Sequence, residues 1–198
     1  MRSTFEWRAV VVLAAVTVLC AASAGAQYQI DQNQPTGTSY IAAFSQTDLA
    51  QSFQPGLPQS VGAGILLEPG QGSTDTVTIQ LWTALPNVGG ATMLAQGSAQ
   101  GTQGQWVDVY WSPVQVTVGQ TYYLVFTGNT TLGVLGEEDN PYPRGYVYAN
   151  PGYQSFVDFD YAFRTWAVPV IPLLGNSGLI VLGLLMLVAG VVALRRFA

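Results

Sequence analysis

The chain contains no histidine and no lysine, and its single cysteine, Cys20, lies close to the amino terminus. Without histidine it cannot form a Ser-His-Asp or Cys-His nucleophile, or the usual histidine-based zinc site. If the amino-terminal segment is removed on export, as argued below, the mature chain also has no thiol and no disulfide. These absences exclude most hydrolase mechanisms.

Charge is scarce as well, because only 9% of the 198 residues are charged. Residues 27–170 carry two arginines and ten acidic side chains, a net charge of −8. Nucleic-acid binding requires lysine and arginine to neutralise phosphates, so this segment is not expected to bind nucleic acid. Glycine and aromatic residues are plentiful instead, with 22 glycines and 12% aromatic residues, a composition typical of secreted or surface-exposed β proteins.

The amino terminus has the features of a secretory signal peptide. Arg2 and Arg8 precede an apolar run at residues 9–22. A small-x-small cleavage pattern follows, formed by Ala24, Ala26 and the succeeding Gln27. A basic start, an apolar stretch and small residues at the cleavage site together define such a peptide. Residues 1–26 are therefore predicted to direct export and to be removed with Cys20.

The carboxyl terminus is predicted to span a membrane. Residues 179–194 contain no charge, and with residues 173–178 they approach the roughly 20 residues that cross a bilayer. Two arginines follow within residues 195–198, and the positive-inside rule places this end in the cytoplasm. The alternative is a buried core helix, which would normally keep a polar stripe that this segment lacks.

The tail also resembles the bacterial carboxyl-terminal protein-sorting signals of the Ile-Pro-Thr-Leu type. These signals combine an Ile-Pro motif, a small-residue turn, an apolar helix and terminal arginines. The matching residues are Ile171, Pro172, Leu174, Gly178, Arg195 and Arg196, whereas Leu173 and Ser177 replace the usual threonine and tryptophan. The resemblance implies a sorting peptidase as partner, and an ordinary single-pass anchor is the alternative.

The segment between the two ends is predicted to be one all-β domain. Residues 77, 79 and 81 are apolar and alternate with polar neighbours, the period-2 pattern of a half-buried strand. Similar alternation at residues 106–111 and 157–166, with turn signals between short strands, favours an antiparallel jelly-roll-like β-sandwich. The predicted organisation is a loose lead-in at 27–37, a sandwich at 38–167 and a Pro/Gly hinge at 168–178.

The body resembles a recurrent domain of bacterial exported proteins that carry interchangeable carboxyl-terminal anchors. The motifs that carry this resemblance include Ala50-Gln51-Ser52-Phe53, Gly104-Gln105-Trp106-Val107, Asn140-Pro141-Tyr142 and Ala162-Phe163-Arg164-Thr165. They spread over about 115 residues. The resemblance implies a β-sandwich exoprotein module without an established catalytic activity.

Calcium is one ligand that the acidic residues could bind. Calcium takes six to eight oxygen ligands, and one short loop supplies several candidates. The candidate ligands are Glu137, Glu138, Asp139 and Asn140, with Asp158 and Asp160 from the last strand. The alternative is a solvated acidic turn. The pair Asp158 and Asp160 could also flank a glycosidic bond, but a small sandwich rarely supplies the cleft that such an enzyme needs.

Carbohydrate is the other ligand that the sequence indicates. Sugar-binding sites stack aromatic rings on sugar faces and bind hydroxyl groups with amide and charged side chains. The candidate residues are Tyr142, Arg144, Asn150 and Tyr153, and the alternative is that such tyrosines face the core. We therefore expect a non-catalytic exported protein that serves as a structural or adhesive module at the cell surface. A lectin-like module that binds polysaccharide, with or without calcium, is the second hypothesis.

Overall fold

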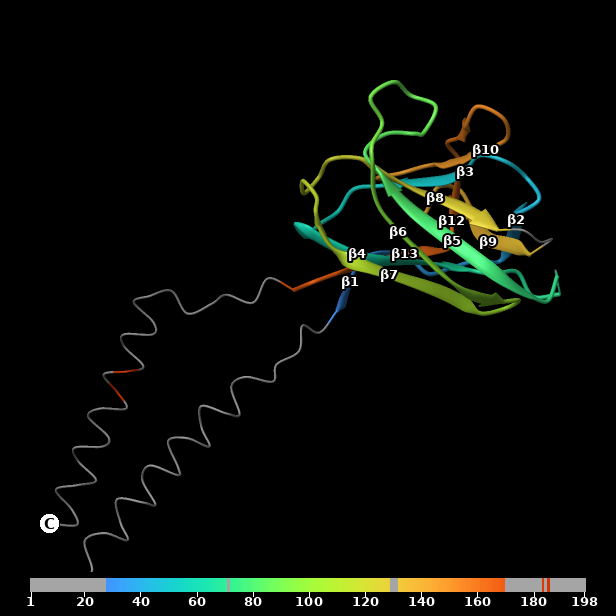
Figure 1. Cartoon of the computed structure of the whole chain (residues 1–198). Coiled ribbons are helices and arrows are strands. Elements are labelled where there is room, and N and C mark those ends of the chain that lie inside the picture. Colours follow the sequence, from blue (N-terminus) through green and yellow to red (C-terminus); the bar gives the residue numbers. More distant parts are fainter. Residues whose placement is uncertain (1–27, 71, 129–131, 170–182, 184, 186–198) are drawn as a thin grey trace, which may run out of the picture.

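The computed structural model describes residues 28–70, 72–128 and 132–169, together with Gly183 and Leu185. Between residues 28 and 169 the regular elements are all strands (Figure 1). Their bounds are β1 Gln29–Gln34, β2 Ser39–Ala43, β3 Leu49–Phe53, β4 Gln59–Leu66, β5 Thr74–Trp82, β6 Met93–Thr102, β7 Trp106–Gln115, β8 Tyr122–Gly128, β9 Gly133–Glu138, β10 Val147–Ala149, β11 Gln154–Phe156, β12 Phe159–Tyr161 and β13 Phe163–Ala167.

These strands form three antiparallel sheets. A four-stranded sheet has the order β1-β13-β4-β7, and a six-stranded sheet has the order β11-β10-β3-β8-β5-β6. A smaller sheet, β12-β9-β2, lies beside them. Phe53 of β3 and Phe163 of β13 bring the two larger sheets together, with ring centroids 6.5 Å apart. The prediction of an all-β protein with packed antiparallel sheets is confirmed, and the arrangement is consistent with a sandwich.

Alternating apolar residues build the core between the sheets. Val77, Ile79 and Leu81 of β5 are completely buried, whereas the intervening threonine and glutamine side chains bond to β6 on the outer face. The same alternation buries Val107 and Val109 of β7, as the sequence predicted. Each large aliphatic side chain removed from water contributes about 1.5–3 kcal/mol, so this alternation fixes which face of each strand points inward.

The two ends of the domain are paired with each other. Gln29 of β1 is the cross-strand partner of Ala167 of β13, and the pairing continues to Gln34 and Phe163. Residues 29–34, which the sequence assigned to a loose lead-in, are therefore a strand of the four-stranded sheet. Their polar composition concealed this, because Gln32 and Gln34 are buried through hydrogen bonds and not through apolar packing.

Several predictions fall on residues outside the described part of the chain. These are the signal peptide at 1–26, the sorting residues 171–178, the arginines at 195 and 196, and most of the membrane span at 179–194, of which Gly183 and Leu185 are helical. Within the described ranges, none of the helical segments is long and apolar enough to cross a bilayer.

Candidate functional site

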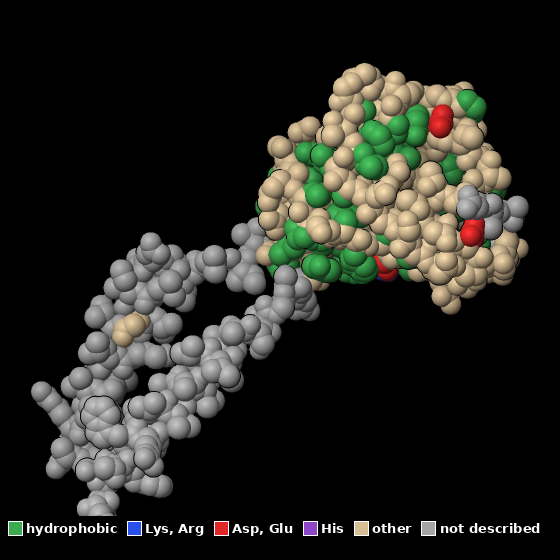
Figure 2. Space-filling view, viewed as in Figure 1, with side chains coloured by type: hydrophobic (Ala, Val, Ile, Leu, Met, Phe, Trp, Pro, Cys, Tyr) green, Lys and Arg blue, Asp and Glu red, His purple; other side chains and the backbone are tan. Residues whose placement is uncertain are grey.

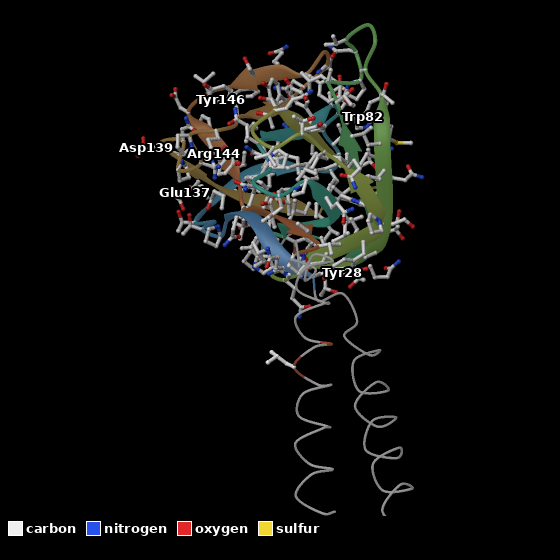
Figure 3. All side chains as sticks on the ribbon, turned by 90° about the vertical axis from the view of Figure 1, so that its left-hand side faces the viewer. Tyr28, Trp82, Glu137, Asp139, Arg144 and Tyr146 are labelled. Carbon is white, nitrogen blue, oxygen red and sulfur yellow. The ribbon has the colours of Figure 1, made fainter. Side chains whose placement is uncertain are left out.

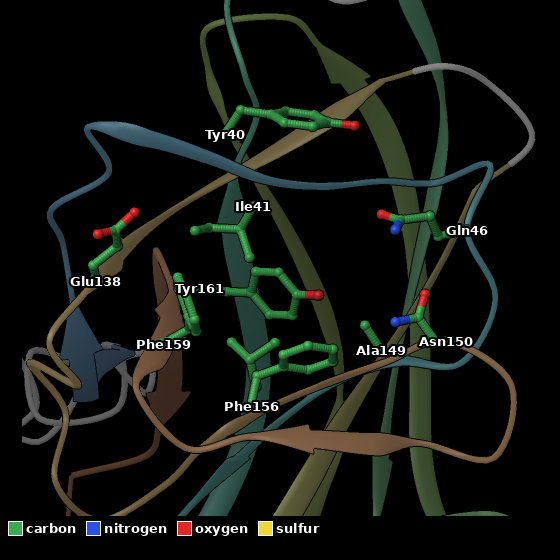
Figure 4. A pocket seen from close by; sticks show the side chains of 10 residues that line it. Tyr40, Ile41, Gln46, Glu138, Ala149, Asn150, Phe156, Phe159 and Tyr161 are labelled. Atoms are coloured by element: carbon green, nitrogen blue, oxygen red, sulfur yellow. The ribbon is translucent and has the colours of Figure 1, made fainter.

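A pocket of about 290 Å³ opens where the small β12-β9-β2 sheet meets β10 and β11 (Figure 4). Its apolar wall is formed by Ile41, Val147, Ala149, Phe156 and Phe159. Tyr40, Gln46, Glu138, Asn150 and Tyr161 add polar groups. Its volume is just below the roughly 300–1,000 Å³ of typical small-molecule sites, and an apolar wall with a few polar groups is their usual composition.

Two backbone features of the small sheet shape this pocket. The register of β2 against β9 shifts between Tyr40 and Ala42, and the extra residue of this irregularity is Ile41. Such a shift lets neighbouring residues approach the same side of the strand, and both Tyr40 and Ile41 line the pocket. Opposite them Gly136 is necessary, because a Cβ there would lie 2.6 Å from Cγ1 of Ile41 and overlap the backbone oxygen of Asp160.

Tyr161 is the most unusual residue of the pocket. Its side chain is fully buried, and its ring packs edge-on against Phe126 with centroids 5.6 Å apart. Among the described residues its hydroxyl has no hydrogen-bond partner, and burial raises the pKa of Tyr161. Figure 4 shows this hydroxyl directed toward the side of the pocket that carries Gln46 and Asn150. A buried polar atom without a partner costs about 1–3 kcal/mol, and a ligand oxygen or a water could supply the missing bond.

The two amides beside Tyr161 retain hydrogen-bonding capacity toward the pocket as far as the described residues go. The Oε1 atom of Gln46 accepts a bond from the backbone N–H of Ala43 at 2.9 Å, which fixes the side chain, and its amide N–H groups bond to none of the described residues. Asn150 has a left-handed backbone, with φ at 66°, and its carbonyl accepts a bond from the N–H of Tyr153. These local bonds hold both amides at the pocket wall, where each can donate to an oxygen atom.

The structure separates the acidic residues that the sequence grouped as calcium ligands. Glu137 bonds to Thr38, Glu138 lines the pocket, and Asp139 is exposed at the turn. Asp158 is exposed in the next turn, whereas Asp160 is fully buried. Across the described ranges no three acidic side chains are grouped so that they could hold a metal ion. The proposed glycosidase pair is likewise divided, because one carboxylate faces solvent and the other faces the interior.

Asp160 instead organises a hydrogen-bond network inside the domain. Its carboxylate accepts bonds from Nε2 of Gln51 at 2.7 Å and from the backbone N–H of Tyr142 at 2.8 Å. The amide of Asn140, oriented by its neighbours, donates a third bond. Burial is the largest influence on this group and raises the pKa of Asp160 from 3.8 to about 6. Asn140, Tyr142 and Asp160 therefore lie close together, but their polar groups bond to one another and to Gln51 of β3 and do not face a ligand.

The predicted sugar-binding residues also have different positions from those expected. Tyr142 is buried, its hydroxyl donates to Gln32, and its ring packs against Phe163. Arg144 donates to the same glutamine oxygen at 2.6 Å. Tyr153 is half-buried and does not line the pocket. Figure 3 shows Arg144 and Tyr146 on the same side of the domain as Glu137 and Asp139.

Of all the predicted ligand residues, only Glu138 and Asn150 line the pocket. The sequence matches no known protein family and shows no significant similarity to a curated protein. Function is therefore inferred from the pocket and from the sequence signals at the two ends. The remaining polar wall consists of Tyr40, Gln46 and Tyr161. No local pattern in the sequence indicates it, because two different strands, β2 and β12, and the loop after β2 bring these residues together.

Proposed function

We propose that this protein is a non-catalytic, exported β-sandwich module that its carboxyl-terminal tail anchors or sorts at the cell surface. We propose further that it is adhesive, and that the pocket beside Tyr161 binds one sugar residue of a surface or matrix polysaccharide. The observation that carries the ligand assignment is the combination of an apolar wall with neutral hydrogen-bonding groups that have no partner among the described residues.

Sugar rings have the complementary chemistry to this pocket. A pyranose ring carries C–H groups on its faces, which can pack against Phe156 and Phe159. Its hydroxyl and ring oxygens can bond to the amides of Gln46 and Asn150 at the pocket wall. A bond to the hydroxyl of Tyr161 also requires the wall to open, because this atom is inaccessible to solvent in the free domain. Among the described lining residues Glu138 is the only charged one, so a neutral sugar is favoured over an acidic one. This chemistry does not require calcium.

The expected affinity is low, as for many surface modules that act in multiple copies. A neutral hexose of about twelve non-hydrogen atoms, at about −0.3 kcal/mol per atom, gains about −4 kcal/mol. That free energy corresponds to a Kd of about 1 mM. Neutral hexoses and N-acetylhexosamines should therefore be tested by ligand-observed NMR, which detects binding of this strength.

A pair of tyrosine variants provides the decisive comparison. Tyr161→Phe removes a hydroxyl that bonds to no described residue, so the fold should be retained while sugar binding weakens by about 1–2 kcal/mol. Tyr146→Phe removes an exposed hydroxyl outside the pocket and should bind as the wild type does. Equal binding by both variants, or no saccharide bound by the wild type, would refute the assignment of a sugar to this pocket. The module would then be purely structural.

The proposed anchoring can be tested separately from the ligand. Intact mass and fractionation of the protein from its own cells should give a chain that begins at Gln27. Ending near residues 172–178 would indicate a processed sorting signal of the Ile-Pro-Thr-Leu type, and ending at Ala198 in the inner membrane would indicate a single-pass anchor. Recovery of the uncleaved chain from the cytoplasm would contradict export.

A further inference from the structure

Exposed aromatic and apolar side chains gather at the end of the domain where β1 begins and β13 ends (Figure 2). Tyr28, Ile30 and Tyr110 are 43%, 45% and 50% exposed. Ile30 is the cross-strand partner of Trp166, so both lie on the outer face of the four-stranded sheet. The ring of Tyr110 lies 5.7 Å from that of Tyr28 and 6.0 Å from that of Trp166. We call these four residues the exit patch.

A glycine in β4, Gly62, leaves the space in which the rings of Tyr110 and Trp166 lie. Tyr110 is paired with Gly62 of β4, and a Cβ at Gly62 would lie 2.9 Å from Cδ1 of Tyr110 and 3.4 Å from Cδ1 of Trp166. The glycine therefore allows the rings to lie over β4. The neighbouring charges neutralise each other, because Arg164 and Asp108 form an ion pair and Asp108 also accepts the indole N–H of Trp166. The patch consequently presents rings and an aliphatic side chain, with little net charge.

The chain enters the domain at β1 and leaves it after β13, and both points lie beside the exit patch. Tyr28 immediately precedes β1, and Ala167, the last residue of β13, is paired with Gln29. Residues 168–178 follow with no charged residue, and the predicted membrane span begins at residue 179.

We infer that the exit patch rests on the lipid–water interface of the membrane that holds the tail. Tyrosine and tryptophan concentrate at this interface because their rings are apolar and their tips polar. The domain segment carries a net charge of −8, so the attraction is apolar and suits zwitterionic phospholipid, whereas a basic patch would select anionic lipid. The inference rests on the proposed anchoring, and it adds a fixed orientation in which β1 and β13 face the bilayer.

Tryptophan fluorescence can test this orientation in the intact mature chain. Residues 168–198 contain no tryptophan, so every tryptophan signal comes from the β domain. The chain should be reconstituted in vesicles of ordinary or of brominated phosphatidylcholine, because bromine quenches only nearby indoles. Trp166 belongs to the patch, whereas Trp82 lies in β5 of the six-stranded sheet, and Figure 3 shows it well away from Tyr28.

We expect brominated lipid to reduce the emission of the wild type and of Trp82→Phe equally, and to reduce that of Trp166→Phe less, because Trp106, which contacts the same Arg164 guanidinium, remains near the patch. Because Trp166→Phe also loses a hydrogen bond, a second pair of variants is needed. Ile30→Asp should reduce the quenching, whereas Val157→Asp, an equally exposed position outside the patch, should leave it unchanged.

The possible failures are distinguishable. A chain that does not float with the vesicles would overturn the proposed anchoring together with the orientation. A chain that floats but shows equal emission in both lipids, or quenching that is undiminished in Trp166→Phe and Ile30→Asp, would overturn only the orientation. Saccharide binding is independent of each of these results.

Discussion

Asp160 should make the stability of the domain decrease as the pH rises. Its carboxylate is fully buried, and its described partners are neutral donors, Gln51, Tyr142 and Asn140. Burial disfavours the charged form and raises the pKa of Asp160 from 3.8 to about 6. Between these values the folded chain holds a proton that the unfolded chain has released. The free energy of unfolding therefore falls as the pH rises through this window.

The magnitude follows from the two pKa values. The step from 3.8 to about 6, at about 1.4 kcal/mol per unit, corresponds to about 3 kcal/mol. This stabilisation should be complete below about pH 4 and absent above about pH 6. Asp160→Asn removes the titration, so its stability should lose this slope. Asp158→Asn, at an exposed position two residues earlier, is the matched control and should keep it.

Urea unfolding of the mature chain, followed by tryptophan emission from pH 3.5 to pH 7.5, measures this difference. The difference in free energy of unfolding between the wild type and Asp160→Asn should change by about 3 kcal/mol across the window, with its steepest part near pH 5. A constant difference, or a wild type that gains stability relative to the variant between pH 4 and pH 6, would refute the assignment of a raised pKa to this buried carboxyl.

Three further substitutions test other contacts. Tyr161→Phe should raise the free energy of unfolding by up to about 1 kcal/mol, measured by urea unfolding, because the lost hydroxyl has no described partner; a loss of 2 kcal/mol would contradict this. Gly136→Ala should cost about 1–3 kcal/mol through overlap with Ile41, whereas Gly89→Ala, in open space, should change little in the same assay. Arg164→Lys should lower the melting temperature by several degrees, because lysine cannot reproduce both the bidentate bond to Asp108 and the stacking on Trp106, 4.3 Å away. An unchanged melting temperature would mean that these contacts do not stabilise the domain.

The strands were the part of the fold most accessible from the sequence. Burial of Val77, Ile79 and Leu81 on one side of a strand produces a period of two that local reading detects. The sequence-based prediction failed where polar residues are buried through hydrogen bonds, as at Gln32 in β1, because such residues give no apolar pattern. The prediction of one continuous strand at residues 157–166 also failed. The chain turns before β12 and bends between β12 and β13, so the alternation is interrupted and Asp160 is buried.

The candidate site was accessible only in part. Glu138 stood out as one of the oxygen-bearing side chains of a short acidic loop and Asn150 as an amide among tyrosines, and both line the pocket. Tyr142 carried the same signal, yet its ring is buried against Phe163. Composition reveals that a side chain can bind a sugar, but it does not reveal whether the ring faces solvent. That depends on which strand lies opposite.

The sequence by itself determined the all-β class, the acidic and thiol-free character of the predicted mature domain, and the predictions of export and anchoring, because each depends on local composition or on a short period. Only the tertiary structure decided which polar groups are satisfied and which are free. It assigned Asp160 to an internal network, brought Tyr161 beside Gln46 and Asn150, and paired the two ends beside the exit patch. Contacts between residues far apart along the chain produce all three results, and no local pattern encodes such contacts.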